Sequence, residues 1–121
     1  AWGQFEGGCS TLMPNSKNRI YGYQGRVLLA LARIEAHYFV NNFFLPPNHF
    51  HKNIESVSQT PAIIVQGRYD MICPINTAYE YSQLWSEAEL IIVPDAGHSA
   101  MEVSIRSALI AACERFKKIE L

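Results

Sequence analysis

The clearest pattern along this chain is a pair of short, wholly apolar runs, residues 62–65 and 90–93, each rich in β-branched side chains. Runs without polar alternation are typical of strands that are covered on both faces in a parallel sheet. The chain between them is long enough for one crossover helix, for which Pro74 and Asn76 form a start signal, with Asn76 as the predicted N-cap. The pattern therefore predicts a βαβ unit.

Apolar positions at helical spacing predict further helices on either side of this unit. They recur from Trp2 to Cys9 and again over residues 26–40. A short helix is expected over about residues 48–57. The last helix follows Ser99-Ala-Met-Glu102, which has the form of a capping box, with Ser99 as the cap and Glu102 three residues on. The predicted fold class is therefore α/β.

Composition narrows the classes of partner. The chain has 121 residues, a formal net charge of −1 and no run of lysine or arginine, so a nucleic-acid partner is not expected. No apolar run is long enough to span a membrane, and no secretory signal is recognised at the N-terminus. The cysteines form no Cys-x-x-Cys pair and the histidines no zinc-ligand spacing, so no disulfide framework, metal site or cofactor is expected. The composition indicates a cytoplasmic protein, with Cys9, Cys73 and Cys113 as small buried apolar residues.

Each predicted strand leads into a turn that carries a candidate ionisable side chain, Asp70 after the first strand and His98 after the second. Because chemistry collects at the carboxyl ends of strands in open α/β sheets, the two residues are candidates for an acid–base pair. A carboxylate that accepts the Nδ1–H of an imidazole fixes its tautomer and leaves Nε2 free to take a proton from a nucleophile. Two structural alternatives remain open: Asp70 as a turn residue, and His98 as a histidine satisfied in front of a helix.

The nucleophile that such a pair serves is missing from the sequence. Asp before His is the chain order of the α/β-hydrolases, whose serine comes earlier in a Gly-x-Ser-x-Gly elbow. No such elbow occurs among the 121 residues, and Gly97-His98-Ser99 does not have that form. The oxyanion-hole loop that usually precedes the elbow is missing as well. The chain therefore holds at most two members of a Ser-Asp-His triad.

Four segments carry a resemblance to a known family. In order and spacing, the chain resembles the C-terminal part of the proline iminopeptidases, α/β-hydrolase serine peptidases that remove an N-terminal proline. The segments are Trp2-Gly-Gln-Phe-Glu-Gly7, Ala32-Arg-Ile-Glu-Ala-His-Tyr-Phe39, Gly67-Arg-Tyr-Asp70 and Asp95-Ala-Gly-His-Ser99. The second segment makes the match specific to this family, whereas the last two indicate only an α/β-hydrolase.

The resemblance implies a role for four residues. The Asp–His pair described above looks like the triad acid and base. Glu6 and Glu35 look like the two cap-domain carboxylates that hold the imino group of the substrate. Two carboxylates suit a secondary ammonium, which offers one positive charge and two N–H donors. Each has a structural alternative: Glu35 as an ion-pair partner of Arg33 or His37, and Glu6 as an ordinary exposed helical residue.

The same resemblance implies how the chain is organised: residues 1–58 as a remnant of the helical cap, and residues 59–121 as the C-terminal part of the α/β-hydrolase core. The chain is expected to start within a longer protein and to be inactive alone. Two parallel strands make a poor sheet, so we expect association with the missing N-terminal half or with another copy. The expected substrates are peptides with an N-terminal proline. Two alternatives remain open: a non-catalytic interaction module derived from an α/β-hydrolase, and an α/β-hydrolase for another ester or amide.

Overall fold

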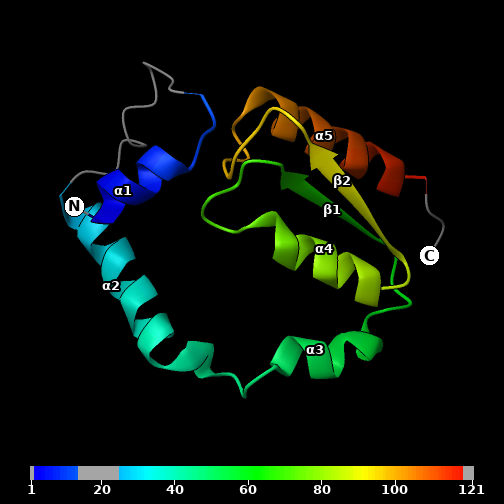
Figure 1. Ribbon diagram of the computed structural model, residues 1–121, viewed down its shortest axis with the longest axis horizontal. Helices are drawn as coiled ribbons and strands as arrows, with labels where there is room; N and C mark the ends of the chain where they lie inside the picture. The colour runs from blue at the N-terminus through cyan, green and yellow to red at the C-terminus, as the bar shows by residue number, and fades with distance from the viewer. Residues whose placement is uncertain (1, 14–24, 119–121) are drawn as a thin grey trace.

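The computed structural model describes residues 2–13 and 25–118. Within these ranges, three helices precede two strands, a fourth helix joins the strands and a fifth follows them (Figure 1). Two 3₁₀ turns, η1 and η2, flank the third helix. The bounds are α1 Trp2–Cys9, α2 Arg26–Val40, η1 Asn42–Phe44, α3 His49–Asn53, η2 Ile54–Ser56, β1 Ala62–Gly67, α4 Ile75–Leu84, β2 Ala88–Val93 and α5 Val103–Phe116.

The two strands pair in parallel along their whole length, from Ala62 opposite Ala88 to Gly67 opposite Val93. α4 crosses between them, so the predicted βαβ unit is confirmed. α4 and α5 lie on opposite sides of the strands, and each of them contacts both strands (Figure 1). A helix packs on each face, which agrees with the apolar character of both strands, although Glu89 and Ile92 of β2 remain exposed.

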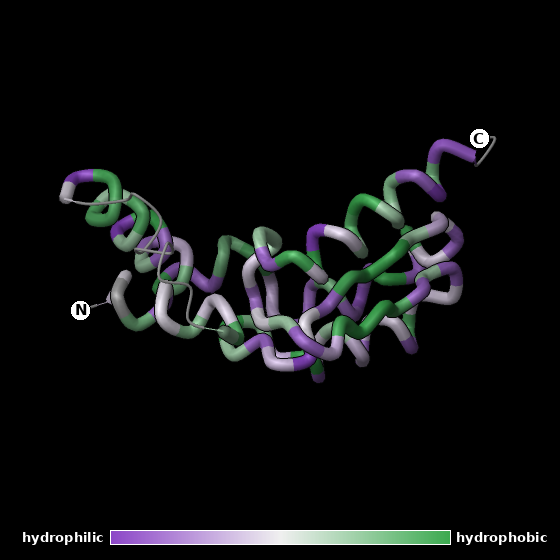
Figure 2. Tube along the Cα trace, turned by 90° about the horizontal axis from the view of Figure 1, so that it is seen from above, coloured by the Kyte–Doolittle hydropathy of each residue, from purple (hydrophilic) through white to green (hydrophobic). Residues whose placement is uncertain are grey.

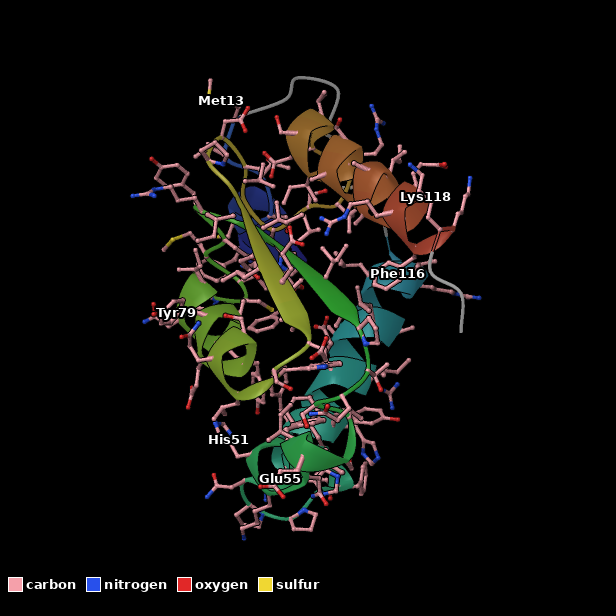
Figure 3. All side chains as sticks on the ribbon, turned by 90° about the vertical axis from the view of Figure 1, so that its right-hand side faces the viewer. Met13, His51, Glu55, Tyr79, Phe116 and Lys118 are labelled. Carbon is pink, nitrogen blue, oxygen red and sulfur yellow. The ribbon has the colours of Figure 1, made fainter. Side chains whose placement is uncertain are left out.

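The buried core is small and lies between the strands and α5. Val93, Ala96 and Ile105 form its centre, with Val65 and Ala108 packed against them. Only four apolar residues of the described ranges are buried, and no residue of α2 is among them. Figure 2 shows hydrophobic residues spread along the trace rather than gathered in one place. Figure 3, seen from the side, shows the strands between α4 and α5. So much exposed apolar surface indicates faces that another surface covers.

The first two helices form a pair because a glycine lets them approach closely. A Cβ atom at Gly3 would lie 2.2 Å from a methyl carbon of Leu28, so with a larger residue there the Leu28 side chain would have to move. The pair lies beside the loop that follows β1 (Figure 1). This placement brings the glutamates of the two helices toward the end of the sheet that carries Asp70.

Two predicted helix starts are wrong. α4 begins directly after Pro74, whose ψ of 141° is not helical, so Asn76 lies in the first turn and is not the N-cap. α5 has Glu102 as its N-cap, and Ser99 lies three residues before it, so the capping box does not form. The reason is that both members have other partners: the backbone N–H of Ser99 donates to the carbonyl of Ser10 at 2.7 Å, and the Glu102 carboxylate binds backbone amides elsewhere.

Candidate active site

The loops that follow β1 and β2 lie side by side at the carboxyl end of the sheet. The N–H of Arg68 donates to the carbonyl of Val93 at 2.9 Å, and the N–H of Tyr69 donates to the carbonyl of Ala96 at 3.0 Å. Gly67 permits this approach, because a Cβ atom there would lie 1.9 Å from the carbonyl oxygen of Gly97. The glycine therefore sets how closely the two loops approach.

The predicted contact between Asp70 and His98 is present in these loops. Nδ1 of His98 lies 3.0 Å from Oδ2 and 3.2 Å from Oδ1 of Asp70. The Asp70 side chain is 7% exposed, whereas the His98 side chain is 39% exposed. Because an ionised carboxylate can only accept, the proton on Nδ1 is the one shared with it. In the neutral ring, Nε2 then carries the lone pair.

The Asp70 carboxylate is held from several sides. Oδ1 accepts the backbone N–H groups of Ile72 at 2.9 Å and Cys73 at 2.8 Å, and Oδ2 accepts the amide of Gln66 at 3.2 Å. The two backbone contacts are those of a turn-forming aspartate. Asp70 therefore has the turn geometry of the structural alternative and faces the imidazole as well. The carboxylate oxygens that accept the loop donors also face Nδ1 of His98, so these contacts orient the carboxylate toward the imidazole.

His98 is anchored through its backbone and open at its far nitrogen. Its N–H donates to the carbonyl of Ser10 at 3.0 Å, which ties the loop to the segment after α1. Among the described residues, Nε2 has no hydrogen-bond partner, and the side chain is more than a third exposed. An imidazole oriented by a buried carboxylate, with a free Nε2, can accept a proton from a hydroxyl brought to it.

A second group of predicted site residues lines a cavity of about 410 Å³ between α1, α2 and the loop after Asp70. Glu6 of α1 and Glu35 of α2 both face it, and they are its two acidic groups. Most other lining residues are apolar, and two of them, Met71 and Ile72, come from the loop that carries Asp70. The complete lining consists of Trp2, Phe5, Glu6, Ile34, Glu35, Tyr38, Phe39, Phe43, Met71 and Ile72.

Glu35 has a partner that the sequence did not indicate. Its Oε2 accepts the indole N–H of Trp2 at 2.8 Å. Among the described residues, no ion pair joins it to Arg33 or His37, the two partners considered from the sequence. Both Glu6 and Glu35 are half-buried. The cavity thus combines apolar walls with two carboxylates, an arrangement that suits a small cation with an apolar body.

The cysteines differ from the prediction that they are buried. All three are free thiols; Cys73 and Cys113 are exposed, and Cys9 is half-buried. Partial burial, followed by the nearby negative charge of Asp70, raises the pKa of the Cys73 thiol. Both effects disfavour the thiolate, so Cys73 is less reactive than an ordinary thiol at neutral pH. It does not have the character of a nucleophile.

Sequence reasoning missed three residues that hold the site in place: Gln66, Ser10 and Glu102. Gln66 is the last residue before the strand-end glycine of β1, and a polar side chain after an apolar run was the available signal. The other two act across the chain. The carbonyl of Ser10 binds the His98 loop, and the carboxylate of Glu102 binds Leu12, which lies 90 residues away. No local pattern reports a contact of that range.

Within the described ranges, no cluster of three histidine, cysteine, aspartate or glutamate side chains is arranged to hold a metal ion. His51, labelled in Figure 3, instead connects α3 to α4, through Glu80 at 2.8 Å and the hydroxyl of Tyr81 at 3.1 Å. No helix there has the length and apolar character that crossing a membrane requires.

Comparison with known proteins places this geometry in a family. Residues 2–104 match the alpha/beta hydrolase fold. The chain belongs to the α/β-hydrolase-fold family. The match includes both loops described above, with Asp70 and His98, and the helices with Glu6 and Glu35.

The curated relatives of this α/β-hydrolase narrow the likeness. It is 43% identical over 117 residues to the probable proline iminopeptidase of Leptolyngbya boryana, covering 96% of this chain and 36% of the relative. It is 42% identical over 120 residues to the proline iminopeptidase of Arabidopsis thaliana, covering 98% and 32%. For the proline iminopeptidase of Xylella fastidiosa strain 9a5c, the identity is 38% over 117 residues, covering 96% and 37%. The chain thus spans about a third of the length of these relatives.

Proposed function

We propose that this chain supplies the acid and the base of a proline iminopeptidase, a serine peptidase that releases an N-terminal proline. Asp70 is the acid and His98 the base. The observation that carries the proposal is the 3.0 Å contact between Oδ2 of Asp70 and Nδ1 of His98, which leaves Nε2 without a partner among the described residues. The likeness to proline iminopeptidases supports the choice of reaction.

The mechanism follows from these positions. A serine hydroxyl from outside the 121 residues gives its proton to Nε2 of His98 and attacks the carbonyl carbon of the N-terminal proline. The C–N bond breaks, the leaving amine takes the proton from His98, and a prolyl ester of the serine remains. Water then gives a proton to His98 and attacks the ester carbonyl; the ester C–O bond breaks, the serine oxygen takes that proton back from His98, and proline is released. Asp70 keeps the ring oriented and stabilises its protonated form.

The cavity beside α1 and α2 is the proposed site of the proline residue. The amino group of this proline is a secondary ammonium. Glu6 and Glu35 supply two negatively charged carboxylates that accept its N–H groups. The pyrrolidine ring lies against the apolar walls. An acylated or internal proline has no positive charge at this nitrogen, so it would leave two half-buried carboxylates unpaired, and the site rejects it.

The proposal requires a further protein surface. The serine elbow is not in this sequence, the sheet has two strands, and α2 buries none of its residues. Isolated pairs of strands are only marginally stable. The remaining part of a longer protein would cover these faces and bring the serine; a second copy of the chain would cover them without it. Three free cysteines suit a reducing compartment, and we place the protein in the cytoplasm.

The test compares this chain with the complete reading frame that encodes it. Proline p-nitroanilide is the substrate, and the N-acetylated compound is the control for the free imino group. We expect the complete protein to cleave only the free form and the chain alone to cleave neither. Activity in the chain alone contradicts the missing nucleophile. A reading frame without an upstream Gly-x-Ser-x-Gly favours a non-catalytic interaction module instead.

Glu35→Gln in the complete protein tests the substrate site. Loss of one charged contact should raise KM for the proline substrate by about tenfold to a hundredfold, since a hydrogen bond to a charged group contributes roughly 1.5–3 kcal/mol. Glu55→Gln, an exposed glutamate in η2, is the matched control. Unchanged KM in Glu35→Gln, with the activity intact, points to an α/β-hydrolase for another ester or amide.

A further inference from the structure

The segment that follows α1 lies against the loop that carries His98. The carbonyl of Ser10 accepts two backbone amides, those of His98 at 3.0 Å and Ser99 at 2.7 Å. The hydroxyl of Ser10 donates to the carbonyl of Glu6 at 2.7 Å, one turn back in α1. A continuous line of hydrogen bonds therefore runs from the helix that carries Glu6 to the backbone of His98.

Glu102 closes the same contact from the other side. Its Oε1 accepts the backbone N–H of Gly97 at 2.7 Å, and its Oε2 accepts the backbone N–H of Leu12 at 3.0 Å. The side chain is half-buried, and the residue is the N-cap of α5, where the helix dipole favours negative charge. One carboxylate thus binds two segments that are remote from each other in sequence, the loop at Gly97 and the segment at Leu12.

The space inside this contact is tight. A Cβ atom at Gly97 would lie 3.1 Å from the nitrogen of Leu12 and 3.3 Å from Oε1 of Glu102. A side chain at position 97 would therefore require these neighbours to shift by a few tenths of an ångström. The backbone directly before His98 is fixed between the carboxylate and the segment after α1.

We infer that Glu102 is a positioning residue for His98. Its carboxylate holds the Gly97–His98 backbone against the segment after α1, so that Nδ1 stays on Asp70 and Nε2 stays aimed at the hydroxyl it must deprotonate. This inference rests on the proposed peptidase function. It adds a residue that touches neither the substrate nor the reacting atoms and acts only through the loop.

The contact should affect turnover more than substrate binding. Two contacts that do not involve Glu102 hold the cavity walls together: Trp2 binds Glu35, and Gly3 packs on Leu28. When the carboxylate is removed, in contrast, the backbone beside His98 loses the charge-assisted contact at Gly97, and the segment after α1 loses the one at Leu12. A misplacement on the order of 1 Å at a reacting group costs roughly a hundredfold in rate.

The experiment uses the complete protein and the variants Glu102→Ala and Glu102→Gln. The number of active sites is titrated with a fluorophosphonate, so that misfolded protein does not count as a loss of kcat. We expect kcat per titrated site to fall about a hundredfold in Glu102→Ala and less in Glu102→Gln, which keeps one acceptor oxygen, while KM stays within about threefold. Glu114→Gln, a carboxylate change on the exposed face of the same helix, should leave both constants unchanged.

Backbone amide exchange supplies a readout that does not depend on activity. The amides of Leu12 and Gly97 should be protected in the wild type and should exchange faster in Glu102→Ala. Unchanged kcat per titrated site in Glu102→Ala overturns the inference, as does a fall that is fully explained by fewer titrated sites. If the wild type cleaves no proline substrate, the proposed function fails and the catalytic role of Glu102 fails with it, whereas amide protection still reports whether the contact exists.

Discussion

Replacing Asp70 by Asn removes the charge of the pair and leaves its shape. The carboxylate accepts four groups: two backbone amides on Oδ1, and the Gln66 amide and the His98 imidazole on or near Oδ2. An asparagine can keep its oxygen toward the backbone amides, but its NH₂ then faces two donors. If the asparagine amide is flipped, its NH₂ points toward the backbone N–H groups of residues 72 and 73 instead. Either way, donors oppose donors, and His98 changes tautomer or turns away.

The size of the effect follows from these contacts. Two hydrogen bonds to a charged acceptor are lost, each worth roughly 1.5–3 kcal/mol, which sums to about 3–6 kcal/mol. His98 is 39% exposed, so water replaces part of its contact, and the free energy of unfolding should fall by about 3 kcal/mol. The fall in kcat should be about 10⁴-fold, as for other buried aspartates that hold an imidazole tautomer.

The assay is hydrolysis of proline p-nitroanilide by the complete protein, with urea unfolding measured in parallel. Asp95→Asn is the control, because Asp95 lies in the same loop as His98 but is exposed and, among residues 2–13 and 25–118, accepts only the hydroxyl of Ser104, at 2.7 Å. Its activity should match the wild type. If Asp70→Asn keeps more than about a tenth of the wild-type kcat while folded, the acid role of Asp70 is refuted.

Two further predictions concern neighbours of this pair. With Cys9 and Cys113 replaced by Ser, alkylation of Cys73 should show a rate–pH curve displaced to higher pH than that of a cysteine peptide, because its raised pKa lowers the thiolate fraction. Asp70→Asn should displace the curve back toward lower pH, and an unmoved curve contradicts the charge effect. Gly67→Ala should lower the free energy of unfolding by about 1–3 kcal/mol, since its Cβ meets the carbonyl of Gly97 at 1.9 Å; an unchanged urea midpoint contradicts that close approach.

Local pattern was sufficient for most of the fold. Apolar β-branched runs identified both strands, and helical spacing identified α2 with the bounds that the structure has. The chain order alone then placed Asp70 and His98 at neighbouring strand ends, because parallel strands end at the same edge of a sheet. Their contact follows from the topology, and the topology can be predicted because both strands are clear apolar runs.

The errors came from contacts between distant segments. Ser99 and Glu102 have the spacing of a capping box, but Ser10 and Leu12 take their hydrogen-bonding groups instead. A pattern of four residues contains no information about a segment some 90 positions earlier. The partner of Glu35 was missed for the same reason, since Trp2 lies 33 residues away. The exposure of Cys73 likewise depends on the tertiary placement of its loop.

The hydrogen bonds around Asp70 come almost entirely from its own neighbourhood: three of the donors lie within four residues of it, and the fourth is His98. The carboxylate is therefore oriented by residues 66–73, while Ser10 and Glu102 hold the backbone beside His98, so every contact that the structure shows around the pair comes from this chain. Under the proposed function, one polypeptide would carry the acid and the base and a second would deliver the serine hydroxyl. If the two were fused to proteins that bind each other, we would expect proline release only when those proteins meet, as in a split-enzyme reporter.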